Sequence, residues 1–166
     1  WGYPTIKVKT LETKVDLITL TLGCDDRLFE AAVNSGARGI VLQGFGSGNA
    51  TPEIVSAVDR ATGNGVVTVV TSRCFDGRVL PLYGDGGGRD LQDAGAIFAG
   101  RLQGPKARIL LCAALATSRS AILLTSSNNS ADSCLHRSWC SATTLARLSM
   151  RLYCRLEPNA LVCIGL

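Results

Sequence analysis

Three glycines at alternate positions and an asparagine make up the segment best suited to ligand chemistry: Gly44, Gly46, Gly48 and Asn49. Glycine lets a backbone turn tightly and approach a ligand closely, so such loops often cradle phosphate groups. The dinucleotide fingerprint, however, is G-x-G-x-x-G with an acid about 20 residues further on. Here the spacing is G-x-G-x-G, the next apolar run ends without an acid, and Asn49-Ala50 stand where a P-loop has Lys and Ser or Thr. The spacing argues against a nucleotide site.

The same loop is expected at the carboxyl end of a parallel strand, which is where α/β sheets place their ligands. The side-chain amide of Asn49 can both donate and accept a hydrogen bond there. Two interpretations therefore stay open. The loop binds a ligand other than a nucleotide, or it is a plain connection whose glycines serve geometry alone.

Other candidate sites in the sequence are weaker. Cys134, His136 and Cys140 give C-x-H-x3-C, but no second half-site has zinc spacing, so no metal site is expected. His136 is the single histidine, and nothing places it beside a cysteine for Cys-His catalysis. No basic patch with interleaved aromatic residues supports nucleic-acid binding.

Strands alternate with helices around the glycine loop, which predicts an α/β fold: a small parallel sheet with helices on both faces. The apolar runs predict strands over residues 15–22, 38–43, 66–71 and 96–99. The helical periodicity predicts helices over residues 25–34, 52–62 and 105–116. Residues 73–89, with five glycines and one proline, are expected to form a long loop.

Local signals set the ends of two of these helices. Thr51 is a plausible N-cap for the second helix, with Pro52 in its first turn. Ser35-Gly36 ends the first helix. The buried face of that first helix is expected to consist of Leu28, Phe29, Ala32 and Val33.

The composition divides the chain near Ala116. Residues 1–14 are polar and basic and are interpreted as a linker or an extended arm. Residues 117–166 form an atypical tail, with nine Ser, nine Leu, five Arg and four of the seven Cys. No apolar run reaches the roughly 18–20 residues of a membrane span. The odd number and irregular spacing of the cysteines indicate reduced thiols in a cytoplasmic protein.

The tail has one periodic segment. Leu145, Leu148, Leu152 and Leu156 are spaced as on one face of a helix ending before Pro158. Such a basic amphipathic helix could lie on a membrane surface, but a helix packed on the domain, or a segment without a stable fold, is the preferred interpretation.

Four segments within residues 15–116 together resemble the C-terminal domain of bacterial L-asparaginases. In order they are Val15-Asp16-Leu17-Ile18, GARGIVLQGFGSGNATPEIVSAVDRA, GVVTVVTSRCFDGRV and AGAIFAGRLQGPKARILLCAALA. The resemblance implies hydrolysis of L-asparagine to aspartate and ammonia, without a cofactor, by a homo-oligomer. It implies no membrane or nucleic-acid partner.

The resemblance also suggests a role for the glycine loop. In the family, the loop matching Gly44–Asn49 reaches the active site of a neighbouring subunit, so Ser47, Gly48 and Asn49 become the expected substrate-binding residues. Asn49 would help to hold the α-amino end of the substrate. Family members also present an acid from a later loop, and the matching position here is Gly88, with Asp85 and Asp90 close by.

The catalytic residues of the family lie in a domain that this sequence does not match. They include a Thr nucleophile in a Thr-Gly-Gly-Thr loop and a Thr-Asp pair, and neither motif occurs here. Thr62-Gly63-Asn64-Gly65 is interpreted as a turn. We therefore expect no catalytic residue and no activity of this chain alone. The alternatives are a non-catalytic oligomerisation or binding module, or part of a glutaminase or amidotransferase relative.

The tail departs from the family as well. Asparaginases usually close with a short helix after the one matching 105–116, and residues 117–166 lack it. We interpret residues 117–166 as a frameshifted, read-through or poorly ordered segment. An asparaginase-like ending in another reading frame past codon 116 would support that interpretation.

Overall fold

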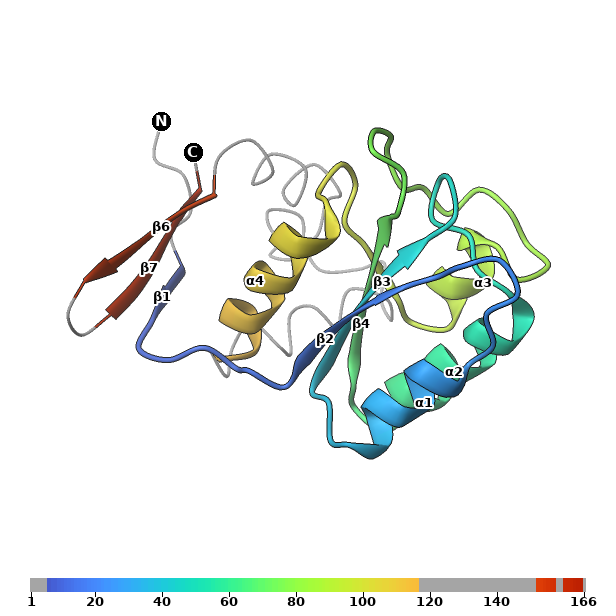
Figure 1. The fold of residues 1–166 in the computed structure, drawn as a ribbon, viewed down its shortest axis with the longest axis horizontal. Coiled ribbons are helices and arrows are strands. Elements are labelled where there is room, and N and C mark those ends of the chain that lie inside the picture. The colour runs from blue at the N-terminus through green and yellow to red at the C-terminus, as the bar shows by residue number, and fades with distance from the viewer. Residues whose placement is uncertain (1–5, 117–151, 158–159, 166) are drawn as a thin grey trace, which may run out of the picture.

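A four-stranded parallel sheet forms the centre of the protein (Figure 1). The computed structural model describes residues 6–116, 152–157 and 160–165. The sheet has the order β2-β3-β4-β5, so each strand pairs with the next one along this part of the chain. Its strands are β2 (Val15–Thr19), β3 (Gly39–Gly44), β4 (Val67–Ser72) and β5 (Ile97–Phe98).

Helices cover both faces of this sheet (Figure 1). One face carries α1 (Arg27–Asn34), α2 (Pro52–Gly63) and α3 (Gly88–Asp93), and the other carries α4 (Gly104–Leu115). The α/β fold predicted from the sequence is thereby confirmed. No helix in the described part of the chain combines the length and the apolarity that crossing a membrane requires.

The core consists of two apolar layers separated by the sheet. Ile40 and Leu42 of β3 pack with Phe29 of α1 and Ile54 of α2. Val41, between them in the strand, faces the α4 side instead. Because side chains alternate across a strand, a strand covered on both faces is apolar along its length. This explains why the buried residues of β3 and β4 are mostly apolar, with Thr68 and Thr71 of β4 as buried polar exceptions.

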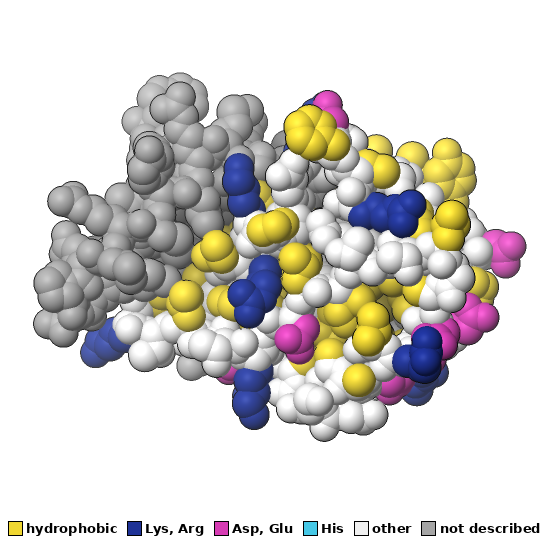
Figure 2. Space-filling view, in the orientation of Figure 1, with side chains coloured by type: hydrophobic (Ala, Val, Ile, Leu, Met, Phe, Trp, Pro, Cys, Tyr) yellow, Lys and Arg dark blue, Asp and Glu magenta, His cyan; other side chains and the backbone are white. Residues whose placement is uncertain are grey.

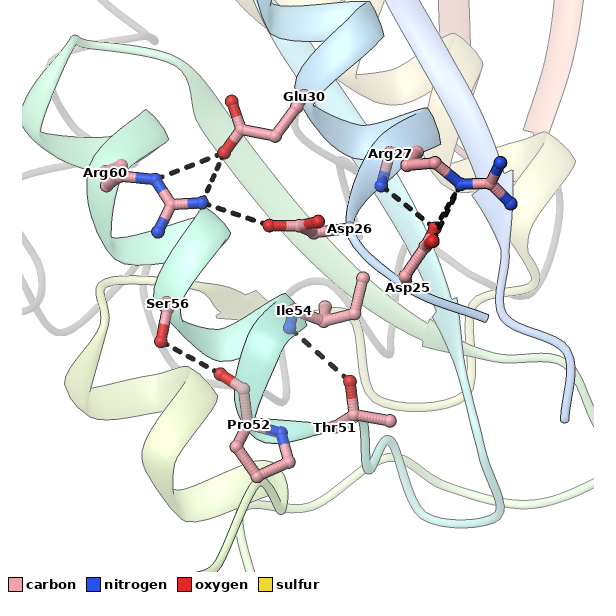
Figure 3. Close-up of polar contacts among 9 residues, drawn as sticks. All are labelled: Asp25, Asp26, Arg27, Glu30, Thr51, Pro52, Ile54, Ser56 and Arg60. Atoms are coloured by element: carbon pink, nitrogen blue, oxygen red, sulfur yellow. Dashed lines mark hydrogen bonds and ion pairs between the residues drawn. The ribbon is translucent and has the colours of Figure 1, made fainter. Parts of the chain in front are cut away.

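The predicted helix ends are largely correct. The Thr51 hydroxyl accepts a hydrogen bond from the backbone N–H of Ile54 at 3.5 Å and caps α2 (Figure 3). Gly36, just after α1, adopts a left-handed φ of 84°. One part of the predicted buried face of α1 is wrong: Leu28 is 69% exposed, whereas Phe29 is fully buried. The helix is only eight residues long, and its orientation on α2 leaves Leu28 in solvent.

A surface ion-pair cluster joins α1 to α2 (Figure 3). Arg60, in the last turn of α2, donates hydrogen bonds to Glu30 of α1 and to Asp26 just before it. All three side chains are partly exposed, so the cluster contributes modestly to stability. It fixes how the two helices lie side by side on one face of the sheet.

A second, antiparallel sheet has the order β1-β7-β6 and was not predicted. Its strands are β1 (Ile6–Val8), β6 (Leu152–Glu157) and β7 (Ala160–Gly165). The helical period proposed for the tail is therefore wrong over Leu152 and Leu156, which lie in β6; Leu145 and Leu148 lie outside the described residues. Leu152 and Leu156 are also an even number of positions apart, as residues on one face of a strand are. The segment that contains them pairs with β7 as strand β6. β1 lies within the segment interpreted as a linker or arm.

Candidate functional site

The candidate site lies at the carboxyl edge of the parallel sheet. The loop after β3, residues 45–51, and the long loop after β4, residues 73–87, lie side by side at this edge (Figure 1). The Leu80 N–H donates to the Ser47 carbonyl at 2.9 Å and joins the two loops directly, and the hydroxyl of Ser72, the last residue of β4, donates to the Gly46 carbonyl at 2.6 Å. The two loops therefore form one connected surface.

The glycine loop is closed by hydrogen bonds of its own. The Phe45 N–H donates to the Asn49 carbonyl at 2.8 Å, and the N–H groups of Gly48 and Asn49 both donate to the Phe45 carbonyl at 2.9 Å. A phosphate cradle needs such N–H groups to be free for the ligand. Because the loop uses those of Gly48 and Asn49 itself, its geometry agrees with the spacing argument against a nucleotide site.

Close packing explains two of the loop glycines. A Cβ at Gly44 would lie 2.7 Å from the Asn49 carbonyl oxygen. Gly48 has a left-handed φ of 99°, and a Cβ there would lie 3.1 Å from side-chain atoms of both Val70 and Val79. Gly48 is thus a buried packing position, and its contribution to any ligand site is to hold its neighbours in place.

Asn49 is half-buried, and its amide has a defined orientation. Its Oδ1 accepts a hydrogen bond from the backbone N–H of Gly88 at 3.1 Å. An N–H must point at an oxygen, so this bond fixes which side of the amide faces α3. Since a carbonyl oxygen has two lone pairs, Oδ1 can accept a second bond while Nδ2 donates. Ser47, also partly buried, is held through its carbonyl by Leu80.

The triglycine segment Gly86–Gly88, where the long loop meets α3, contacts the end of the glycine loop. The Gly86 carbonyl accepts from the Ala50 N–H at 3.1 Å, and the Gly86 N–H donates to the carboxylate of Asp90 at 2.8 Å. A Cβ at Gly88 would lie 2.9 Å from the Leu80 carbonyl oxygen. Gly88, which the resemblance aligns with the family's acid, therefore cannot hold a side chain without movement of the backbone.

The two neighbouring acids differ in availability. Asp90 is engaged with Gly86 at the start of α3. Asp85 is exposed and adopts a left-handed φ of 55°, which is uncommon outside glycine. Its side chain is free to project from the rim of the site, whereas that of Asp90 supports the loop.

Arg73 is a residue at this edge that the sequence analysis did not select. It directly follows β4, and its guanidinium lies over the ring of Phe45 at 4.7 Å and donates to the Leu20 carbonyl at 3.0 Å. A single arginine after a strand has no sequence signature, because both of its partners are distant along the chain.

The remaining sequence candidates lie away from this edge or outside the described residues. Thr62 and Gly63 are the last two residues of α2, and the turn predicted over residues 62–65 consists of Asn64 and Gly65, which has a φ of 79°. Cys134, His136 and Cys140 lie outside the described residues. Within the described part no cluster of three metal-binding side chains is found. Burial raises the pKa of the Cys112 thiol, in α4.

Large apolar side chains gather around the rim of the site. Four of the most exposed ones lie in the loops that follow β2 and β4: Leu22, Phe75, Leu82 and Tyr83. On the face drawn in Figure 2, apolar side chains are interspersed with basic and acidic ones. Exposed apolar groups beside a polar site are typical of surfaces that contact another protein.

Sequence comparison finds relatives of this segment. The family described as the glutaminase/asparaginase C-terminal domain matches residues 14–122. The L-asparaginase of Bacillus licheniformis is 33% identical over 109 residues, which cover 65% of this chain and 34% of that protein. A glutamyl-tRNA(Gln) amidotransferase subunit of Pyrococcus horikoshii is 39% identical over 88 residues, covering 52% of this chain and 20% of that protein.

Structure comparison agrees on the fold. L-asparaginase I of Vibrio cholerae superposes with a TM-score of 0.60 at 24% sequence identity, over 72% of this chain and 36% of that one. The chain thus spans about a third or less of the length of the curated relatives it matches.

Proposed function

This chain belongs to the glutaminase/asparaginase C-terminal domain family, and on that premise we propose that it serves an L-asparaginase-type amidohydrolase. Such an enzyme converts L-asparagine and water to L-aspartate and ammonia without a cofactor. In this proposal residues 15–116 form the domain, residues 1–14 an arm and residues 117–166 a separate tail. The protein acts in the cytoplasm as part of a homo-oligomer, for which the exposed apolar rim provides a contact surface.

The orientation of Asn49 is the observation that supports this proposal best. The side chain lies at the carboxyl edge on a loop that is closed internally and fixed by Gly88. The second lone pair of Oδ1 can accept a hydrogen bond from the α-ammonium group of the substrate. Ser47 contributes a neighbouring hydroxyl, while Gly48 contributes through the shape of the loop.

The chain is proposed to be inactive by itself. A threonine hydroxyl becomes a nucleophile only beside a base that takes its proton. The sequence contains neither Thr-Gly-Gly-Thr nor Thr-Asp, and Thr62 lies in a helix at the opposite edge of the sheet from Asn49. The nucleophile would come from another domain, and this domain would bind the substrate.

A second candidate is a part of a tRNA-dependent amidotransferase. Its support is the 39% identity over 88 residues to the Pyrococcus horikoshii protein. The site would then hold the α-amino end of glutamine or asparagine through the same Asn49 contact. A non-catalytic module is the third candidate.

Ammonia release in a reconstituted mixture tests the proposal. We expect no turnover of asparagine or glutamine by the 166-residue chain alone, and turnover once the N-terminal domain of the Bacillus licheniformis asparaginase is added. In that mixture Asn49→Ala should raise KM about 10- to 100-fold, since it removes a hydrogen bond to a charged group. Asn64→Ala, at the exposed end of α2, is the matched control.

Three outcomes would count against parts of the proposal. Turnover by the chain alone would mean that the nucleophile is present here. No turnover in the mixture would favour the non-catalytic module. Turnover with glutamine but not with asparagine would favour the amidotransferase or glutaminase alternative.

A further inference from the structure

We propose that Arg73 is the positioning residue that holds the glycine loop after β3, residues 45–51, in its ligand-binding conformation. The inference rests on the proposed function in one respect: it takes Asn49 as the residue that meets the substrate. The conformation of the loop itself depends only on the contacts of Arg73.

Arg73 joins the carboxyl ends of three neighbouring strands. Its backbone N–H donates to the carbonyl of Gly44, the last residue of β3, at 3.0 Å. Its Nη1 donates to the carbonyl of Leu20, just after β2, at 3.0 Å. Because Arg73 itself follows β4, one residue connects β2, β3 and β4 at the edge where the site lies.

The third contact of Arg73 reaches the loop through Phe45. The guanidinium lies over the Phe45 ring at 4.7 Å, within the range of a cation–π interaction. The backbone of Phe45 makes the hydrogen bonds that close the loop, with the Gly48 N–H and with both backbone polar groups of Asn49. Holding the ring of Phe45 therefore also holds the backbone from which the Asn49 side chain extends.

The chemistry of arginine suits this role better than that of lysine. A planar guanidinium can stack on a ring and donate in its own plane at the same time, whereas an ammonium is a single point charge. Among the described residues, no carboxylate lies within ion-pair distance of Arg73. The charged guanidinium of Arg73 thus contacts the Phe45 ring and the Leu20 carbonyl, and makes no salt bridge with a described residue.

The position of Arg73 separates this role from general support of the fold. Arg73 is exposed and belongs to neither apolar layer of the core, whereas the Phe45 ring that it covers packs against the layer on the side of α1 and α2. Losing its guanidinium should free the loop without opening the core. A loop that must be ordered by the ligand binds it more weakly, so the effect belongs in KM and not in kcat.

Hydrogen exchange on the 166-residue chain tests the positioning directly. In Arg73→Met, which keeps the aliphatic stem, we expect the amides of Gly48 and Asn49 to exchange about tenfold faster, because one charged hydrogen bond and one cation–π contact are lost. The Val41 amide, in the centre of β3, should stay within about twofold of its original rate. Arg73→Lys should fall between the two.

Arg78→Met is the matched control. Arg78 is an exposed arginine of the same long loop, and it makes no hydrogen bond or ring contact with residues 45–51 in the described structure. It should leave the exchange of Gly48 and Asn49 unchanged. Unchanged exchange of these two amides in Arg73→Met would overturn the proposal, whatever the assembled mixture catalyses.

Kinetics in the reconstituted mixture test the link to the substrate. Arg73→Met should raise KM for asparagine about tenfold with kcat nearly unchanged, and Arg73→Lys should recover part of the loss. Faster loop exchange with an unchanged KM would overturn the positioning role for the substrate. If the unsubstituted mixture shows no turnover, the proposed function fails, while the exchange result still decides what Arg73 does to the loop.

Discussion

Two glycine-rich connections lie at opposite ends of α2, and they use glycine for different reasons. Before α2, a Cβ at Gly44 would lie 2.7 Å from the Asn49 carbonyl oxygen, and a Cβ at Gly48 would lie 3.1 Å from side-chain atoms of Val70 and Val79. After α2, Gly63 and Gly65 have no atom within 4 Å of a Cβ position. There only the left-handed φ of Gly65 requires glycine, and Gly63 has no structural requirement of either kind. Close packing around Gly44 and Gly48 therefore distinguishes the candidate site from the glycine-containing turn after α2.

The largest expected effect comes from filling the packed connection. Gly48→Ala should lower the free energy of unfolding by about 2–4 kcal/mol, because it combines a left-handed φ with a Cβ that meets Val70 and Val79. Gly63→Ala should be neutral or stabilise by up to about 1 kcal/mol. Urea unfolding of both variants measures the contrast, and equal effects would remove the distinction between the two connections.

The next effect concerns the position that matches the family's acid. Gly88→Asp should lower the free energy of unfolding by about 1–3 kcal/mol and should not raise activity in the reconstituted mixture, because its Cβ meets the Leu80 carbonyl. Gly88→Ala separates the contribution of the Cβ from that of the charge. A gain in activity from Gly88→Asp would show that the loop can rearrange to present an acid.

A smaller effect is expected at the N-terminus of α2, beside the site. Thr51→Ala should lower the free energy of unfolding by about 1 kcal/mol, since it removes the bond from the Ile54 N–H to the Thr51 hydroxyl. Thr51→Ser retains the cap and should cost less. Thermal unfolding compares the two, and identical melting temperatures would show that the cap at 3.5 Å contributes little.

The smallest effect belongs to the other end of α2. Arg60→Met should lower the free energy of unfolding by less than about 1 kcal/mol, because its partners Asp26 and Glu30 are only partly buried. The loss should shrink further in about 0.5 M salt, which screens exposed charges. A loss above about 2 kcal/mol that salt leaves unchanged would show that this cluster matters more than its exposure indicates.

Most of the parallel-sheet domain could be predicted because its signals are local. The apolar runs of β3 and β4, the Thr51-Pro52 start of α2 and Gly36 after α1 are each contained in a few neighbouring residues. The features that the sequence analysis missed or misplaced lack such a clear local signal. The six-residue α3 is too short to show a period, and Leu28 was assigned to the buried face of α1 together with Phe29 although only Phe29 is buried.

The candidate site was predicted only in part. The sequence selected Ser47, Gly48 and Asn49 through their family resemblance, and it selected the carboxyl edge through strand order. It could not show that Gly48 is packed between Val70 and Val79, or that Asn49 is oriented by Gly88. These contacts join residues that are 22 to 39 positions apart, and no spacing rule encodes them.

The sequence by itself determined the order of the four strands and of α1, α2 and α4 in the parallel-sheet domain, and with it the edge at which the candidate site lies. Periodicity and capping act between residues that are close along the chain, so a single sequence displays them. Only the tertiary structure decided that Gly88 has no room for an acid, that residues 152–157 pair as a strand, and that Arg73 joins three strand ends. Each of these features joins segments that are far apart in the sequence. The steric exclusion at Gly88, the pairing of residues 152–157 and the contacts of Arg73 therefore arise only when the chain has folded.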